Sequence, residues 1–413
     1  MDKQFNRTIT FFTLYLIFFL DLAGVAIVLV VFSPVILQAN SPLIASETTL
    51  HTRNLIVGFL FAAYPLTQFF GAPLIGELSD RYGRRPVLLI SNLGTTLAFA
   101  LTAYALDRGS LVLVFIGRLA AGLFAGNLTV AQAGVSDLSA PHDRPRRMAL
   151  FSAVGGIAWM VAPYIGSLSS DDKFVSWFSY STPFWMMAAL FFIILLFLLF
   201  FVQECLSERE RSHEGKNPFL NLISVFKLTH LRTPLLLGTL VMLGWMFFEG
   251  FIGTYLIQKF HFTEVWIGNA FAFFALFWFL GGLFANVLVK KLSPDRLNIV
   301  PLIFASLSMF IIGLATKTPL LWIFAAVANF AMANVLACFF GIFTKLAPEE
   351  ELGKVFGLWT AGFALFSAIG PPFAGWISRY ALALPFYVAG LWILLIFFLY
   401  LKWLFIWRNR AEK

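Results

Sequence analysis

Long apolar stretches separated by short polar segments dominate this chain. Each is about twenty residues or longer, the length that an α-helix needs to cross a hydrocarbon layer of about 30 Å. The pattern predicts an all-α integral membrane protein with twelve transmembrane helices. We place these near residues 9–38, 55–76, 86–106, 111–137, 148–168, 182–203, 234–258, 264–290, 297–316, 319–346, 353–377 and 382–407.

The first apolar stretch is predicted to be a membrane helix and not a signal peptide. It is too long for the apolar region of a signal peptide, and it carries an acid, Asp21, near its middle. No small-residue cleavage pattern follows before the next loop. We therefore count this stretch among the twelve helices.

Composition supports the membrane assignment and excludes several functions. Hydrophobic residues make up 60% of the 413 residues and charged residues 12%, with a mean hydropathy of +0.85. The net charge of +8 comes from basic residues spread over short loops without interleaved aromatics, so no nucleic-acid partner is expected. The two cysteines, Cys205 and Cys338, have neither the number nor the spacing of a disulfide framework or metal site. We expect no metal and no cofactor.

The basic residues also predict the orientation in the membrane. Most of the 29 lysines and arginines lie in loops on the same side as the two termini, while Arg118 lies inside a helix. Basic loops stay on the cytoplasmic side. Both termini are therefore predicted to be cytoplasmic.

A charged segment at residues 204–233 interrupts the apolar rhythm and is predicted to be a cytoplasmic linker. It would separate an N-terminal six-helix bundle, residues 1–203, from a C-terminal six-helix bundle, residues 234–413. Loose alternation of apolar and polar residues in 219–228 fits an interfacial helix as well as a plain solvated linker. The sequence leaves both possibilities open.

Between the second and third apolar stretches, residues 76–89 read Gly-Glu-Leu-Ser-Asp-Arg-Tyr-Gly-Arg-Arg-Pro-Val-Leu-Leu. This segment resembles the G-x-L-x-D-R-x-G-R-R/K-x-x-x-L signature of major facilitator superfamily transporters, a cytoplasmic connection in that family. Its glycines allow a tight reversal, and its arginines avoid hydrocarbon. The resemblance implies a gating role, with the acid free to contact another helix end. The gating residues expected here are Gly76, Asp80, Arg81, Gly83, Arg84 and Arg85.

Further matches narrow the resemblance. Arg118 and Gly122 fit an R-x-x-x-G element in the fourth stretch, and Asp137 with Arg144 fits the D-x(6)-R element that follows, which we assign to the gating motif. Together these elements are most similar to the drug:proton antiporters, including the tetracycline-efflux group. The fifth stretch departs from them, because residues 158–167 carry alanine and serine where the antiporter pattern G-x-x-x-G-P-x-x-G-G has glycines. This departure leaves the direction of transport open.

Three charged residues, Asp21, Arg118 and Glu249, lie inside apolar stretches. A charge at a helix centre costs about 2.5–3.5 kcal/mol on insertion scales, so such residues usually face a cavity or a partner. We expect Asp21 to carry a coupling proton, Arg118 to bias its release and Glu249 to act as a second acid. The two acids also occupy corresponding helices of the two halves, which suggests parallel repeats. Purely structural pairing of each residue is the alternative.

Polar side chains near these charges are candidates for a substrate cavity. At 100° per residue, Thr129 and Gln132 lie within about 40° of Arg118 on the fourth helix, which makes one small and polar stripe. Trp245 lies one turn before Glu249, and Asn334 lies in the tenth stretch. A hydrogen bond to a neighbouring helix is the alternative role for Asn334. The predicted cavity residues are Thr129, Gln132, Trp245 and Asn334.

The sequence contains no Gly-x-x-x-x-Gly-Lys-Ser/Thr loop, so an ion gradient is the expected energy source and no enzymatic activity is expected. The leading hypothesis is a secondary active transporter that exports a small amphipathic compound in exchange for protons by alternating access. Proton-coupled import of a nutrient, metabolite or iron chelate is the alternative. A transporter-like receptor or scaffold is disfavoured, because it would not need both the hinge motif and the intramembrane charges. We expect a monomer in the bilayer of the bacterial inner membrane.

Overall fold

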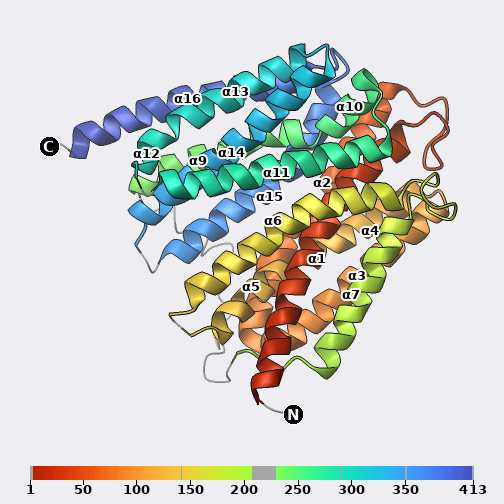
Figure 1. Ribbon diagram of the computed structural model, residues 1–413, viewed down its shortest axis with the longest axis horizontal. Coiled ribbons are helices and arrows are strands. Elements are labelled where there is room, and N and C mark those ends of the chain that lie inside the picture. The colour runs from red at the N-terminus through yellow and green to blue at the C-terminus, as the bar shows by residue number, and fades with distance from the viewer. Residues whose placement is uncertain (1–2, 141, 207–228, 290, 349–350, 412–413) are drawn as a thin grey trace. The chain divides into compact units, whose positions relative to one another are not determined.

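The computed structural model of the protein describes residues 3–140, 142–206, 229–289, 291–348 and 351–411, which contain helices and turns but no strand (Figure 1). The first half contains α1 (Lys3–Leu37), α2 (Leu50–Tyr82), α3 (Arg84–Asp107), α4 (Leu111–Leu123), α5 (Asn127–Leu138), α6 (Arg144–Ser169) and α7 (Thr182–Phe200). The second contains α9 (Thr229–Glu249), α10 (Ile252–Phe260), α11 (Glu264–Leu288), α12 (Pro294–Leu297), α13 (Ile299–Leu314), α14 (Thr318–Leu346), α15 (Leu352–Ile377) and α16 (Leu384–Ala411).

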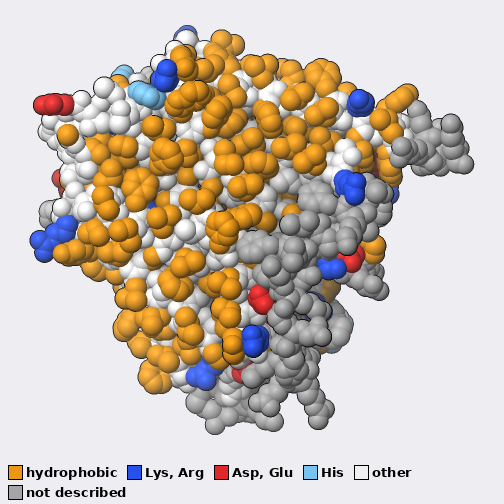
Figure 2. All heavy atoms as spheres, turned by 180° about the vertical axis from the view of Figure 1, so that it is seen from behind, with side chains coloured by type: hydrophobic (Ala, Val, Ile, Leu, Met, Phe, Trp, Pro, Cys, Tyr) orange, Lys and Arg blue, Asp and Glu red, His pale blue; other side chains and the backbone are white. Residues whose placement is uncertain are grey.

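Twelve helical segments of the described chain are long and apolar enough to cross a membrane, which confirms the predicted number. Three of them combine two helices each, namely α4 with α5, α9 with α10, and α12 with α13. Figure 2 shows one face of the molecule covered largely by hydrophobic side chains. An apolar surface of this extent is stable in lipid and would be a liability in water.

The described residues group into two compact units. Unit 1 takes those within 1–49, 63–218 and 262–272, and unit 2 takes those within 50–62, 219–261 and 273–413. In unit 1, α1 packs on α5, α6 and α7, and α3 packs on α4 and α7. In unit 2, α9 packs on α14, α15 and α16, and α13 packs on α14 and α16. The division into two six-helix bundles stays a prediction, and residues 207–228 of the expected linker lie outside the described residues.

The connection between the second and third spans is much shorter than predicted. The predicted spans leave residues 77–85 as a charged connection, but α2 continues to Tyr82 and α3 begins at Arg84, which leaves Gly83 alone between them. Gly83 has φ 100° and ψ 159°, a conformation that essentially only glycine adopts. Asp80 of α2 and Arg84 of α3 form an ion pair across this connection, so both charges are satisfied although the helices are separated by one residue.

Two spans that the sequence predicted as continuous helices are interrupted. The fourth breaks at residues 124–126 and the seventh at residues 250–251. Both breaks contain a glycine pressed against a neighbour: a Cβ on Gly126 would lie 2.3 Å from Ile75, and one on Gly250 would lie 2.5 Å from the Pro371 ring. Hydropathy runs through both breaks unchanged, because lipid requires apolar side chains whether or not the backbone is continuous.

Candidate functional site

Asp21 lies on α1 within unit 1 and is only 8% exposed. The Asn127 side chain and the backbone N–H of Leu128 lie beside its carboxylate, and its Oδ2 atom has no hydrogen-bond partner in the described part of the chain. Both neighbours belong to the first turn of α5. The positive end of that helix dipole therefore points at the acid. The break in the fourth span makes this possible, because it creates a helix N-terminus inside the span.

Two hydroxyls of α3 orient Asn127. Its Nδ2 donates to Thr95 Oγ1 at 3.2 Å, and its Oδ1 accepts from the Ser91 hydroxyl. Asn127 itself is fully buried. A satisfied buried network of this kind holds its members in a single arrangement. It fixes the amide that faces Asp21.

Arg118 on α4 is 2% exposed and rests against aromatic rings. Its guanidinium carbon lies 5.1 Å from the centroid of Tyr64 and 6.0 Å from that of Phe32. Its Nε has no hydrogen-bond partner, and the described residues contain no ion pair between Arg118 and Asp21. Arg118 and Asp21 are therefore not in direct contact in this structure.

Tyr64 links the two charges and was missed from the sequence. It lies close enough to both Asp21 and Arg118 to interact electrostatically with each. Its position follows from a close approach of α2 and α4, where a Cβ on Gly122 would lie 2.1 Å from the Tyr64 carbonyl oxygen. The R-x-x-x-G spacing thus places Arg118 one helical turn before Gly122, the residue at which α4 contacts α2. In the sequence, Tyr64 is distinguished only as a tyrosine that precedes a proline in an apolar stretch.

The predicted polar stripe on the fourth span does not lie on one continuous helix. Arg118 is buried, whereas Thr129 and Gln132 on α5 are exposed. The prediction counted 100° per residue along one helix, and the break at residues 124–126 invalidates that count. Lining of a substrate cavity by Thr129 and Gln132 stays a prediction.

Glu249 is the last residue of α9 in unit 2 and is half-buried. The Trp245 side chain lies beside its carboxylate, and the Trp245 ring packs on Phe248 and Trp278 with centroids 4.8 and 5.3 Å apart. The acid therefore has the aromatic surroundings expected from the sequence. The fourth predicted cavity residue, Asn334, is buried on α14.

Within the gating motif, Arg84 is the residue that the others bind most closely. It is only 7% exposed. Its Nε donates to Asp137 Oδ2 at 2.9 Å, its Nη1 donates to Ser79 Oγ at 2.7 Å, and the same nitrogen pairs with Asp80. The structure thus joins three helices, α2, α3 and α5, through one guanidinium. Docking of Asp80 on another helix end stays a prediction.

Glu204 completes this cluster and was not identified from the sequence. Its carboxylate accepts the backbone N–H of Arg84 at 2.7 Å and of Arg85 at 3.2 Å, so it caps α3. The Arg85 side chain donates to the Leu198 and Leu199 carbonyls at the end of α7. In the sequence, Glu204 is distinguished only as the first acidic residue after the sixth apolar stretch.

The remaining motif residues lie apart from this cluster. Arg81 is exposed and stacks on the Tyr82 ring at 5.3 Å. Arg144, the other residue of the D-x(6)-R element, is exposed at the start of α6 and forms no ion pair with Asp137 among the described residues. Asp137 binds Arg84 instead. Gly76 of α2 faces Thr129, with 3.9 Å between its built Cβ position and the threonine methyl group.

The cluster makes a testable prediction about Cys205. Burial raises the pKa of the Cys205 thiol to about 12 from an ordinary value of 9.0, and the Glu204 and Asp137 carboxylates add to the rise. Because only the thiolate is nucleophilic, iodoacetamide should label Cys205 slowly at about pH 8, with a rate still rising at about pH 10. Cys338→Ser removes the other thiol. A rate that levels off near pH 9, as for unfolded protein, would contradict the buried cluster.

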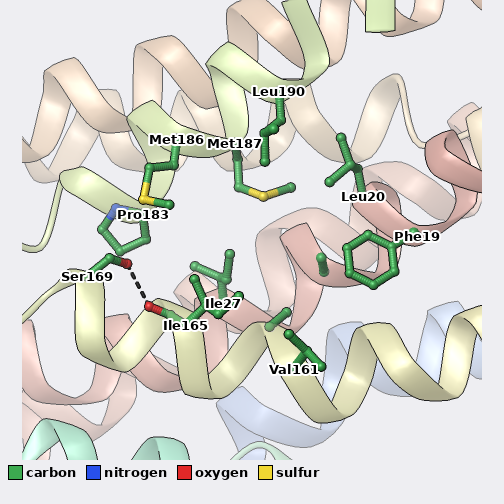
Figure 3. Close-up of a pocket in the computed structure, with 12 residues that line it drawn as sticks. Phe19, Leu20, Ile27, Val161, Ile165, Ser169, Pro183, Met186, Met187 and Leu190 are labelled. Atoms are coloured by element: carbon green, nitrogen blue, oxygen red, sulfur yellow. Dashed lines mark hydrogen bonds between the residues drawn. The ribbon is translucent and has the colours of Figure 1, made fainter. Parts of the chain in front are cut away.

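A small cavity lies between α1, α6 and α7 in unit 1 (Figure 3). Its volume of about 70 Å³ is well below the ~300 Å³ or more of typical ligand pockets. The hydroxyl of Ser169 at its edge already donates to the Ile165 carbonyl at 2.8 Å. The cavity is a packing defect beside Leu20 and not a substrate site.

Residues 14–315 and 234–413 match the model of the Major Facilitator Superfamily, so the chain belongs to this family of membrane transporters. The class E tetracycline resistance protein of Escherichia coli is 27% identical over 380 residues, 89% of this chain and 86% of that protein. Major facilitator superfamily domain-containing protein 10 of Mus musculus is 27% identical over 349 residues, 76% of this chain and 71% of that protein. The resemblance predicted from the motifs is confirmed.

A solved structure supports the fold. The crystal structure of the human organic anion transporter MFSD10 (TETRAN) superposes with a TM-score of 0.71 at 21% identity. The superposition covers 95% of this chain and 99% of that chain. The predicted facilitator fold of twelve membrane helices is confirmed.

Proposed function

We propose that this transporter exports a small amphipathic compound in exchange for protons by alternating access. The observation that carries the proposal is Asp21, a buried acid with one unpartnered oxygen at the N-terminus of α5. The similarity to tetracycline resistance proteins favours export, since removal of the drug is the simplest way for a transporter to give resistance.

Asp21 can exchange a proton at a place where charge is costly. The ionised carboxylate is stabilised by Asn127 and by the dipole of α5, and it is penalised by its burial. Protonation removes both effects. The protonated and the ionised forms of Asp21 would therefore favour different conformations of the transporter. Arg118 would act on this equilibrium through Tyr64, and Glu249 would be a second acid near the substrate.

Transport of an organic anion is a second candidate. Arg118 carries a buried guanidinium whose Nε lacks a partner, and a carboxylate on a substrate would satisfy it. The relative from Mus musculus adds weight to this candidate, because human MFSD10 is an organic anion transporter. Proton-coupled import of either kind of compound would instead move the proton and the compound in the same direction.

We also propose that both termini are cytoplasmic in a bacterial inner membrane, that the protein acts as a monomer, and that it has no enzymatic activity. The gating motif, Gly76 to Arg85 with Asp137 and Arg144, would control the cytoplasmic side. Arg84 supports this role, because it already connects α2, α3 and α5.

Proteoliposomes with an imposed pH gradient test the direction of coupling. An exchanger should concentrate radiolabelled tetracycline in vesicles with an acidic lumen, because protons leave as the compound enters. A protonophore should abolish the accumulation. Accumulation in vesicles with an alkaline lumen would instead identify proton-coupled import, and a labelled aromatic carboxylate in place of tetracycline tests the organic anion candidate.

A further inference from the structure

Unit 2 contains an apolar groove that the transport mechanism above does not use. It lies between α11, α13 and α14 and has a volume of about 600 Å³, within the ~300–1,000 Å³ range of small-molecule sites. Its lining includes none of Asp21, Arg118 and Glu249, but it does include Asn334, which the sequence predicted as a substrate-cavity residue. The aromatic side chains that line it are Phe273, Phe277, Phe284, Phe304, Trp322 and Phe330.

The groove opens at the surface of membrane-spanning helices. Phe304 is 51% exposed and Ile323 is 57% exposed, and both belong to segments that are apolar enough to cross a bilayer. A ligand would therefore reach the groove from the lipid. Along α14 the lining extends from Trp322 to Asn334, about 18 Å at 1.5 Å per residue.

One buried polar group in the lining is unsatisfied. Asn334 is 2% exposed, and its Nδ2 donates to the Phe330 carbonyl at 2.8 Å. The carbonyl can only accept, which fixes Nδ2 on that side and leaves Oδ1 on the other. Oδ1 has no hydrogen-bond partner among the described residues. An acceptor left without a partner in apolar surroundings destabilises the site, so a hydrogen-bond donor from a ligand would stabilise it.

We propose that this groove is a binding site for an uncharged, lipophilic aromatic molecule that carries one hydroxyl or N–H donor. The aromatic rings of the lining would pack on the rings of the ligand, and its donor would bind Asn334 Oδ1. A phospholipid acyl chain fits the apolar walls but has no donor to offer near the middle of α14. The proposal does not depend on proton-coupled export.

Equilibrium dialysis of the full-length protein in nanodiscs tests this with 1-hydroxypyrene and 1-methoxypyrene. The two probes share a ring system and differ in the donor. Empty nanodiscs of the same lipid give the background from membrane partitioning, and no ion gradient is applied. We expect the hydroxyl compound to bind about tenfold more tightly than the methyl ether, the effect of about one buried hydrogen bond.

Two variants assign the preference to the groove. Asn334→Leu keeps the side-chain size but removes the acceptor, so the two probes should bind equally. The matched control is Asn329→Leu on the same helix: Asn329 is also buried and also donates to a carbonyl one turn back, at 2.8 Å, but it does not line the groove. This variant should keep the tenfold preference.

Equal binding of the two probes to the wild-type protein would overturn the proposal, because the groove would then accept hydrocarbon without regard to a donor. This comparison needs no variant to fold. Loss of the preference in Asn329→Leu, or its retention in Asn334→Leu, would also overturn it. Binding and transport are measured separately, so failure of one does not imply failure of the other.

Discussion

Asp21→Asn is expected to abolish concentrative transport while retaining downhill exchange of substrate. Asparagine has nearly the shape of a protonated aspartate, but its side chain neither releases nor binds a proton near neutral pH. The variant should therefore keep the contacts of α1 with α5 and lose the coupling of substrate movement to the gradient. Uptake into proteoliposomes, with and without an imposed pH gradient, measures both activities.

Glu47→Gln is a matched control for this experiment. It removes a carboxylate from an exposed position outside the membrane spans and should transport like the wild type. Accumulation by Asp21→Asn at the wild-type level with the same pH dependence would remove Asp21 from the mechanism. Glu249 would then be the candidate acid.

Gly83→Ala is expected to destabilise the protein by at least about 2 kcal/mol. The backbone at Gly83 has φ 100°, and a Cβ there would lie 2.4 Å from Glu204 Oε2. Alanine would force either α2 or α3 to shift and would push the capping carboxylate away from the N–H groups of Arg84 and Arg85. The midpoint of thermal unfolding in detergent should fall, and less protein should remain monodisperse after heating.

Gly282→Ala provides the comparison. This glycine lies within α11, and a Cβ at this position would meet no atom of the described residues within 4 Å. Alanine also has the higher helix propensity, so Gly282→Ala should leave the midpoint unchanged or raise it slightly. An unchanged midpoint in Gly83→Ala would show that the connection of α2 to α3 tolerates a side chain.

Membrane helices and intramembrane charges could be predicted from the sequence because lipid imposes strong and local demands. Each span must be apolar for about twenty residues, and an acid such as Asp21 is conspicuous inside it. These demands are satisfied residue by residue and do not depend on the rest of the fold. The number of spans and the family resemblance were therefore predicted correctly.

The surroundings of those charges could not be predicted in the same way. Tyr64 reaches Arg118 because α2 and α4 approach closely at Gly122, and Glu204 reaches α3 from the end of the sixth span. Both are contacts between distant parts of the chain. The helix break at residues 124–126 also had no signature in hydropathy, and it separates Arg118 on α4 from Thr129 and Gln132 on α5.

The interrupted spans have a mechanical consequence. A continuous helix is a stiff rod that transmits a tilt from one membrane surface to the other. The α4–α5 and α9–α10 segments are instead pairs of shorter rods, with α5 about 18 Å and α10 about 14 Å long at 1.5 Å per residue. Each pair is joined by two or three residues, so the two ends of one span can change tilt independently, and bending is confined to the immediate neighbourhood of Asn127 and Glu249.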